Sequence, residues 1–279
     1  SMDKTLYLSD LDGTLMQPGA YLTQETIDLL NRSIGEGKLF TVATARTPAT
    51  VAGIIKDVKM SLPAIVFTGA AIWNPASGKY SDIRYMDADS AAELAETYRK
   101  EKFPIFHFTL ENDVINIYHI GGKLNELERR FMEERLHSPY KRFHISATGE
   151  DMLPPDISKT IIFYGMQPTY LAEAIHERVS GLPGCRHQCY HDIYGQEIAL
   201  VDAFAPDATK ANAVLRMKEK TGADRVVAFG DNLNDIPMLQ AADVAVAVEN
   251  ALPEVKEIAD IVIGPNTDDA VAEFISGDR

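Results

Sequence analysis

Apolar residues recur along this chain with strand spacing in some stretches and helix spacing in others, and their order predicts the elements. The run 5–8 is apolar enough for a buried strand, and apolar residues recur at helical spacing over 27–34. Two more apolar runs, 38–43 and 64–67, are separated by a segment that begins like a helix. Alternating strands and helices predict parallel strands joined by right-handed crossovers.

The alternation of predicted strands and helices changes near residue 84. A helical segment over about 90–102 is followed by two strand-like runs, 105–110 and 114–120, with no helix between them. Successive strands of this kind favour antiparallel pairing and an α+β arrangement. We therefore predict an inserted domain over residues 84–189.

After the insert, strands and helices alternate again, with a strand expected over 196–202 and another over 225–229. The predicted fold class is α/β. A Rossmann-like, doubly wound parallel sheet would form the core from residues 1–83 and 190–279, with an α+β cap domain inserted at 84–189.

Composition narrows the classes of function. The chain has 279 residues, of which 46% are hydrophobic, but no apolar run of roughly 18 residues that would suggest a membrane span. A net charge of −14 argues against nucleic acid or an anionic membrane as a partner, because both favour basic surfaces. Cys185 and Cys189 are expected to be free thiols on one strand, which fits a cytoplasmic protein.

Polar residues gather where the predicted core strands end or where the next helix begins. They are Asp10 with Asp12, Thr44, Lys210, and the turn Gly230-Asp231-Asn232-Leu233-Asn234-Asp235. The carboxyl ends of parallel strands lie along one edge of a sheet, so these residues can converge. Clustered carboxylates repel one another unless a cation compensates, and hard oxygen ligands suit Mg²⁺. Taken alone, Asp-Gly at 12–13 is equally typical of a solvated turn.

With these motifs in this order, the sequence resembles the haloacid dehalogenase superfamily of phosphohydrolases, in particular its Cof-like members with a large α/β cap. The resemblance rests on Asp-Leu-Asp-Gly-Thr-Leu at 10–15, Ala-Thr-Ala-Arg at 43–46, Lys210, and Gly-Asp-Asn-Leu-Asn-Asp at 230–235. The insert falls between the second and third motifs, where this subclass places its cap. One departure is Thr68, because many members have asparagine there.

The resemblance implies four catalytic residues. Asp10 would be the nucleophile that becomes an aspartyl phosphate, and Asp12 the general acid and base. Thr44 would hydrogen-bond the phosphoryl oxygens. Lys210 would neutralise the phosphoryl group and Asp10.

It also implies two sets of ligands. The phosphate-binding set is Asp10, Thr44, Ala45, Arg46, Lys210 and Asn234. The Mg²⁺ set is Asp10, Asp12 through its backbone carbonyl, and Asp231, with Asp235 orienting a metal-bound water or Lys210. For Arg46, a salt bridge is at least as plausible as a contact with substrate.

The expected activity is therefore Mg²⁺-dependent hydrolysis of a small phosphomonoester, such as a sugar phosphate, with the cap selecting the leaving group. Two alternatives remain: a phosphomutase of the same fold, and a phospho-accepting receiver-type signalling protein. Product analysis distinguishes the phosphomutase, which would form an isomeric phosphosugar without releasing phosphate. Stable phosphorylation of the protein without turnover would indicate the receiver-type protein.

Overall fold

The computed structural model describes residues 4–193 and 197–279, which fall into two compact units. The core unit comprises the chain up to Asp82 and from Ala208 onward, and the insert unit is Ile83–Asp207. Among the described residues, no helix combines the length and the apolar character that crossing a membrane would require. The predicted class, an α/β core with an inserted second sheet, is confirmed.

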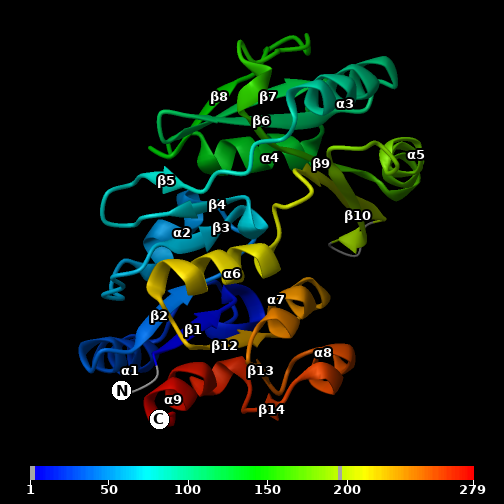
Figure 1. Ribbon diagram of the computed structural model, residues 1–279. Helices are drawn as coiled ribbons and strands as arrows, with labels where there is room; N and C mark the ends of the chain where they lie inside the picture. Colours follow the sequence, from blue (N-terminus) through cyan, green and yellow to red (C-terminus); the bar gives the residue numbers. More distant parts are fainter. Residues whose placement is uncertain (1–3, 194–196) are drawn as a thin grey trace. The chain divides into compact units, whose positions relative to one another are not determined.

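The core unit is built on a five-stranded parallel sheet of order β14-β13-β12-β1-β2 (Figure 1). Its strands are β1 (Thr5–Ser9), β2 (Leu39–Val42), β12 (Arg225–Gly230), β13 (Val244–Ala247) and β14 (Ile261–Val262). The chain runs from β1 to β2 on one side and returns to β12 on the other, so the strand order reverses at β1. The carboxyl end of β1 is therefore the switch point at which open α/β sheets bind ligands.

The helices of the core unit are α1 (Gln24–Gly35), α2 (Pro48–Ile55), α6 (Lys210–Thr221), α7 (Ile236–Ala241), α8 (Pro253–Ile258) and α9 (Ala270–Gly277). Some of them cover the two faces of this sheet, as doubly wound folds require. Helices α1 and α9 pack together on one face, and α6 and α7 pack together on the other (Figure 1). Sequence signals fix the helix ends: the Thr23 side chain caps α1, and Gly222 ends α6 in the left-handed conformation.

A small antiparallel sheet follows β2 in the core unit. It consists of β3 (Ala64–Val66), β4 (Ala71–Trp73) and β5 (Tyr80–Ser81). A single parallel bridge between Ala43 and Ile65 connects it to the end of β2. The run 64–67, expected as a third parallel strand, therefore pairs mainly with β4, which the sequence analysis did not identify.

The insert unit has a six-stranded mixed sheet of order β10-β11-β9-β6-β7-β8. Its strands are β6 (Ile105–Glu111), β7 (Val114–Ile120), β8 (Lys141–His144), β9 (Thr160–Pro168), β10 (Arg186–Ile193) and β11 (Ile198–Phe204). The predicted antiparallel hairpin of β6 and β7 is confirmed, whereas β8 pairs parallel to β7.

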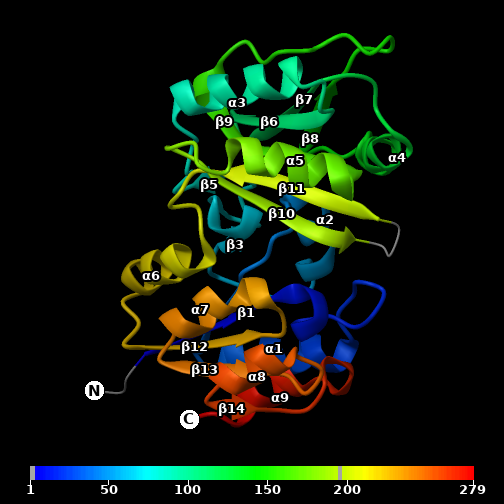
Figure 2. The same cartoon turned by 90° about the vertical axis from the view of Figure 1, so that its right-hand side faces the viewer.

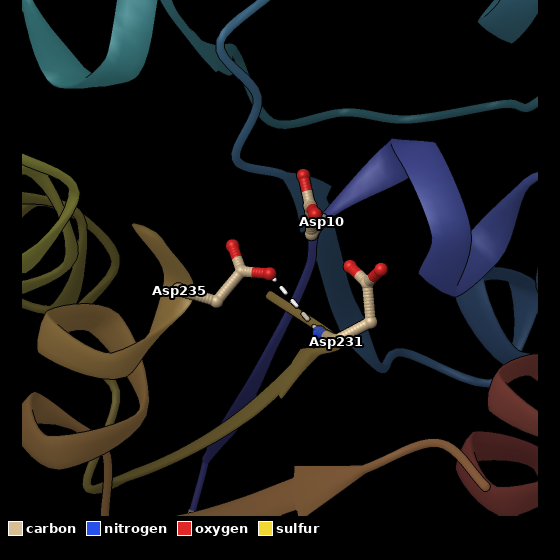
Figure 3. Close-up of side chains that lie close together, drawn as sticks. All are labelled: Asp10, Asp231 and Asp235. Atoms are coloured by element: carbon tan, nitrogen blue, oxygen red, sulfur yellow. Dashed lines mark hydrogen bonds between the residues drawn. The ribbon is translucent and has the colours of Figure 1, made fainter. Parts of the chain in front are cut away.

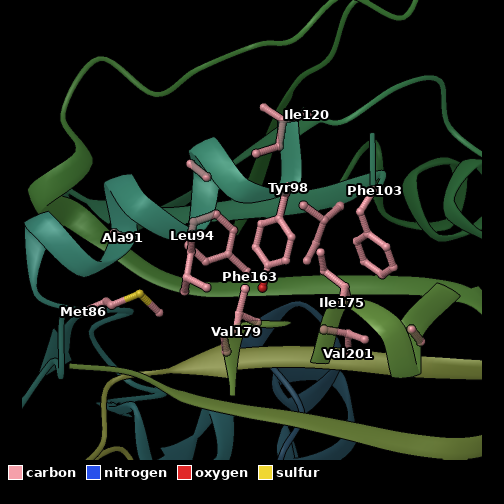
Figure 4. Packing of buried hydrophobic residues seen from close by; sticks show 14 of the residues in the cluster. Met86, Ala91, Leu94, Tyr98, Phe103, Ile120, Phe163, Ile175, Val179 and Val201 are labelled. Carbon is pink, nitrogen blue, oxygen red and sulfur yellow. The ribbon is translucent and has the colours of Figure 1, made fainter. Parts of the chain in front are cut away.

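This sheet is flanked by α3 (Ala88–Lys100), α4 (Glu126–Arg135) and α5 (Thr169–Val179). Helices α3 and α5 cover one face, and their apolar side chains pack with those of the strands around Tyr98 and Phe163 (Figure 4). Helix α5 lies along β10 and β11 (Figure 2). Helix α4 inserts Phe131 against Phe106 and Phe108 of the sheet. The insert thus has its own hydrophobic core.

One predicted boundary is wrong. The strand expected over 196–202 in the core is β11, which pairs with β9 and β10 in the insert sheet; Gln196 itself lies outside the described residues. The insert therefore ends at Asp207 rather than at residue 189, and the core resumes at Ala208. A nearly continuous apolar strand is typical of a sheet centre, but its composition does not say which of two sheets it joins.

Candidate active site

Asp10 occupies the switch point of the core sheet. It follows β1 directly, its backbone N–H donates to the carbonyl of Phe229 on β12 at 3.1 Å, and it is only 6% exposed. The chain then turns tightly through η1 (Leu11–Leu15), where Gly13 has φ +73°. A Cβ on Gly13 would lie 2.1 Å from Oδ2 of Asp231, so only glycine fits between the turn and this carboxylate.

Three carboxylates, those of Asp10, Asp231 and Asp235, form a cluster at this edge of the sheet (Figure 3). Each contributes one oxygen, and these oxygens lie within 4.8 Å of one another. Oδ2 of Asp235 accepts the backbone N–H of Asp231 at 3.0 Å, and Thr14 Oγ1 donates to Asp231 Oδ1 at 2.9 Å. The predicted convergence of these residues, far apart in sequence, is thus observed in the structure.

Lys210 supplies positive charge inside this carboxylate cluster. It is the first residue of α6, whose N-cap is Thr209, and it is 2% exposed. Its Nζ lies 3.2 Å from Asp10 Oδ1 and 2.9 Å from Asp235 Oδ1. A buried lysine between two carboxylates fixes their positions and opposes their mutual repulsion.

Burial and neighbouring charges have opposing effects on the pKa values of the cluster. Burial raises the pKa of Asp10 well above its ordinary value; Lys210 opposes this rise, and Asp235 adds to it. Burial also raises the pKa of Asp231. For Asp235, burial is outweighed by Lys210 and by the N–H of Asp231, which lower its pKa. Although burial alone would lower the pKa of Lys210, Asp10 and Asp235 raise it, so the ammonium stays charged.

The donor set of the cluster fits a divalent cation. All three side chains offer carboxylate oxygens, which are hard ligands, and no imidazole or thiol belongs to the group. The Lys210 ammonium pairs with two of the three carboxylates, those of Asp10 and Asp235, so the cluster keeps an excess of negative charge that a cation would compensate.

Thr44 and its neighbours form the second strand end of the site. Thr44 is fully buried after β2, and its Oγ1 accepts the backbone N–H of Arg46 at 3.0 Å. Because this lone pair is occupied, the Thr44 hydroxyl proton can be donated elsewhere. Ala45 lies exposed in the same loop. The Arg46 side chain binds both carboxylate oxygens of Asp12, at 2.7 and 2.8 Å.

Two predicted residues lie outside the buried cluster. The Asp12 side chain is 57% exposed and contacts Arg46 instead of Lys210. Asn234 is exposed in the turn η4 (Leu233–Asp235), which places Asp235 in the cluster. The structure therefore separates a buried set of charges from an exposed rim.

Several residues that shape the site had no role in the sequence-based predictions. Asn250 donates to the carbonyl of Gly13 at 2.9 Å, and Asn266 donates to Asn250 Oδ1 at 3.0 Å, which ties the turn after β1 to the C-terminal segment. Gly69 has φ +100°, and a Cβ there would lie 2.2 Å from the carbonyl oxygen of Thr209, just before Lys210. Thr14 lies within the motif at 10–15 and could have been assigned a role from it. Single asparagines in loops, such as Asn250 and Asn266, belong to no motif that would mark them.

A sequence profile of known proteins decides the family. The profile described as haloacid dehalogenase-like hydrolase matches residues 7–275. The chain belongs to this family. The match runs through both parts of the core and across the insert, so it confirms the predicted family. Relatives that are named phosphatases confirm the predicted enzyme class.

Several relatives align over nearly the whole chain. The pyridoxal phosphate phosphatase YbhA of Escherichia coli is 27% identical over 95% of each protein. The 5-amino-6-(5-phospho-D-ribitylamino)uracil phosphatase YitU of Bacillus subtilis is 22% identical, over 95% of this chain and 94% of its own.

Solved structures show the same fold. A haloacid dehalogenase-like hydrolase from Bacteroides thetaiotaomicron has a TM-score of 0.76 at 19% identity, over 98% of both chains. A sugar phosphatase of subclass IIB has a TM-score of 0.71 at 20% identity, over 97% of this chain and 96% of its own. At these identities the likeness concerns the fold alone.

Proposed function

We propose that this haloacid dehalogenase-like hydrolase is a Mg²⁺-dependent phosphatase that cleaves small phosphomonoesters through an aspartyl phosphate on Asp10. The observation that carries the proposal is the position of the Asp10 carboxylate, at the switch point, beside Lys210 and within the carboxylate cluster. A nucleophile for phosphorus needs an oxygen anion beside positive charge, which balances the phosphoryl oxygens during transfer.

In the first step, Asp10 attacks phosphorus. The new bond joins the carboxylate oxygen to phosphorus while the ester P–O bond breaks, and Asp12 gives a proton to the departing oxygen. In the second step, water attacks the same phosphorus and passes a proton to Asp12, while the bond between the Asp10 oxygen and phosphorus breaks. Inorganic phosphate is released, and the Asp10 carboxylate is restored. Lys210 and the Thr44 hydroxyl stabilise the charge on the phosphoryl oxygens in both steps.

The carboxylate oxygens of Asp10 and Asp231 would hold Mg²⁺, together with the backbone carbonyl of Asp12. When bound, the ion supplies a positive charge that orients the substrate and withdraws charge from a phosphoryl oxygen. Asp235 would orient Lys210, which it contacts at 2.9 Å. Asn234 and the Ala45 loop are proposed to lie beside the bound phosphate, at the exposed rim.

The proposed substrate class rests on the relatives. Their names give pyridoxal phosphate and 5-amino-6-(5-phospho-D-ribitylamino)uracil as substrates, and a sugar phosphatase shares the fold. All are small phosphorylated metabolites. We assign the choice of leaving group to the insert unit, because the clustered charges of the core recognise a phosphoryl group and a cation but nothing specific beyond them.

A phosphate-release screen tests this function. Purified protein would be supplied with Mg²⁺ and a panel of sugar phosphates, pyridoxal phosphate and nucleotides, and inorganic phosphate would be measured against the dephosphorylated product. Equal amounts of both are expected, and activity should vanish in excess chelator and return with Mg²⁺. Formation of an isomeric phosphosugar without phosphate release would indicate a phosphomutase, and stable protein phosphorylation without turnover a receiver.

A further inference from the structure

Arg46 and Asp12 form a two-point ion pair beside the carboxylate cluster. Nε of Arg46 donates to Asp12 Oδ2 at 2.8 Å, and Nη2 donates to Asp12 Oδ1 at 2.7 Å. We propose that Arg46 is the positioning residue for Asp12, which it holds in place for proton transfer to the leaving oxygen, and not a ligand of the phosphoryl group. This inference rests on the proposed function.

Asp12 needs such a partner because little else restrains it. Its side chain is 57% exposed, and among residues 4–193 and 197–279 only Arg46 hydrogen-bonds its carboxylate. The turn η1 fixes the Asp12 backbone, since the carbonyl of the next residue accepts from Asn250, but it leaves the side-chain torsions free. A proton donor contributes to catalysis only when it is held within hydrogen-bond reach of the reacting oxygen.

Arg46 is itself anchored well enough for this task. Its backbone N–H donates to Thr44 Oγ1 at 3.0 Å, and its carbonyl accepts the N–H of Phe67 at 3.1 Å. The side chain is 27% exposed and bridges from the end of β2 to the turn after β1. The hydrogen bonds to Asp12 raise the pKa of Arg46, so the guanidinium remains charged. Two neighbouring strand ends are therefore fixed to each other by one planar side chain.

The same geometry argues against phosphate binding by Arg46. The edge of the guanidinium that carries Nε and Nη2 is aligned with the Asp12 carboxylate, and that edge cannot clamp a phosphoryl group at the same time. The Arg46 side chain also lines a surface hollow of about 420 Å³. Truncation of this side chain should therefore enlarge an open space and leave the fold intact.

The leaving group distinguishes a positioning role from a binding role. Breaking an alkyl phosphate requires proton transfer to a strongly basic oxygen, whereas p-nitrophenolate departs without a proton. The experiment measures kcat/KM for glycerol phosphate and p-nitrophenyl phosphate with wild type, Arg46→Ala, Arg46→Lys, Asp12→Asn and the double variant. We expect Arg46→Ala to lower kcat/KM for glycerol phosphate by at least about tenfold, and that for p-nitrophenyl phosphate by less than about threefold.

The two further comparisons sharpen the test. In the Asp12→Asn background, Arg46→Ala should have almost no further effect, because the two residues act as one unit. Arg46→Lys should recover only part of the loss, since an ammonium cannot match both carboxylate oxygens. Arg225→Ala removes a comparable pair with Asp278, 2.9 Å apart at the amino end of β12, and serves as the control that should leave the ratio of the two substrates unchanged.

Other outcomes would overturn the inference. An equal loss of kcat/KM for both substrates in Arg46→Ala, with KM raised, would make Arg46 a phosphate ligand. If Arg46→Ala lowers kcat/KM for glycerol phosphate as much in the Asp12→Asn background as in wild type, Arg46 acts independently of Asp12. If Asp12→Asn discriminates between the substrates but Arg46→Ala does not, the inference fails and the proposed function stands; if wild type releases phosphate from neither ester, both fail.

Discussion

The ammonium nitrogen of Lys210 lies 3.2 Å from Oδ1 of Asp10, although 200 positions separate the two residues in the sequence. Both side chains are buried, and the same nitrogen also contacts Asp235. The fold thus brings a cation from the start of α6 to the switch point at the end of β1. This pairing makes the clustered negative charge tolerable in a buried position and available for chemistry.

Removing the ammonium group of Lys210 should therefore destabilise the protein. Lys210→Met leaves Asp10 and Asp235 buried without their partner, and we expect the free energy of unfolding to fall by about 3 kcal/mol in metal-free buffer. Added Mg²⁺ should restore part of it by compensating the carboxylates. Urea unfolding measures both values. Lys218→Met removes an exposed pair with Asp243 and should cost less than about 1 kcal/mol; equal losses in the two variants would contradict the buried role.

Gly13 should tolerate no side chain, because its missing Cβ makes room for Asp231. Gly13→Ala would place a methyl group 2.1 Å from Asp231 Oδ2, so the carboxylate must move and Mg²⁺ affinity and kcat should both fall by at least about tenfold. Gly37→Ala is the matched control: φ is also positive, at +95°, but no atom lies within 4 Å of the added Cβ. It should show only the backbone cost of about 1–2 kcal/mol, with normal activity. Normal metal affinity in Gly13→Ala would refute the steric argument.

Thr68 should be a point of backbone strain. Its φ is +58°, a conformation that β-branched residues avoid and asparagine tolerates, while its N–H donates to the carbonyl of Thr44 at 3.0 Å. Thr68→Asn keeps that hydrogen bond and should raise the free energy of unfolding by about 1 kcal/mol. Thermal unfolding provides the comparison with Thr68→Val, which retains the branch and should give no gain. A lower melting temperature for Thr68→Asn would show that the threonine side chain is itself required.

Asp202 should make stability depend on pH. It is 9% exposed on β11, and its Oδ1 has no hydrogen-bond partner among residues 4–193 and 197–279. Burial raises the pKa of Asp202 to about 7, and Arg186 opposes this rise. The folded protein keeps this proton while the unfolded chain loses it above about pH 4. Because the folded state holds the extra proton in this range, the free energy of unfolding falls as the pH rises from about 4 to about 7, by up to about 1.4 kcal/mol per pH unit. Below about pH 4 this contribution is fully present.

Asp202→Asn should remove this dependence. Urea unfolding of wild type and variant, measured near pH 5 and near pH 8, should show the variant gaining stability relative to wild type at the higher pH. Asp89→Asn, at an exposed position of the same unit, should leave the difference between the two pH values unchanged. A parallel pH profile for Asp202→Asn and wild type would mean that Asp202 is ionised in the folded state.

The strand ends could be predicted from the sequence, but the pairing of side chains between them could not. Asp10, Asp231 and Lys210 were identifiable because each follows an apolar strand or begins a helix, and the parallel order places those points at one edge. That Arg46 would bind Asp12 was not predictable, since an arginine near a site has many acidic partners within reach of its flexible stem.

The same limit explains the misplaced strand. Residues 198–204 are nearly all apolar, as a buried strand of either sheet would be, and only tertiary pairing assigns β11 to the insert. Local composition therefore identified the element but not its sheet. The short strands β4 and β8 were missed because three or four residues carry too little periodicity to be recognised.

The central claim, that Asp10 attacks phosphorus, is tested most directly by the turnover of Asp10→Asn with saturating Mg²⁺. The amide keeps the shape of the side chain but cannot form the acyl phosphate, so we expect kcat to fall by at least about 10⁴-fold. Thermal unfolding would verify that the variant remains folded. Phosphate release at near the wild-type rate by a folded Asp10→Asn protein would contradict the account.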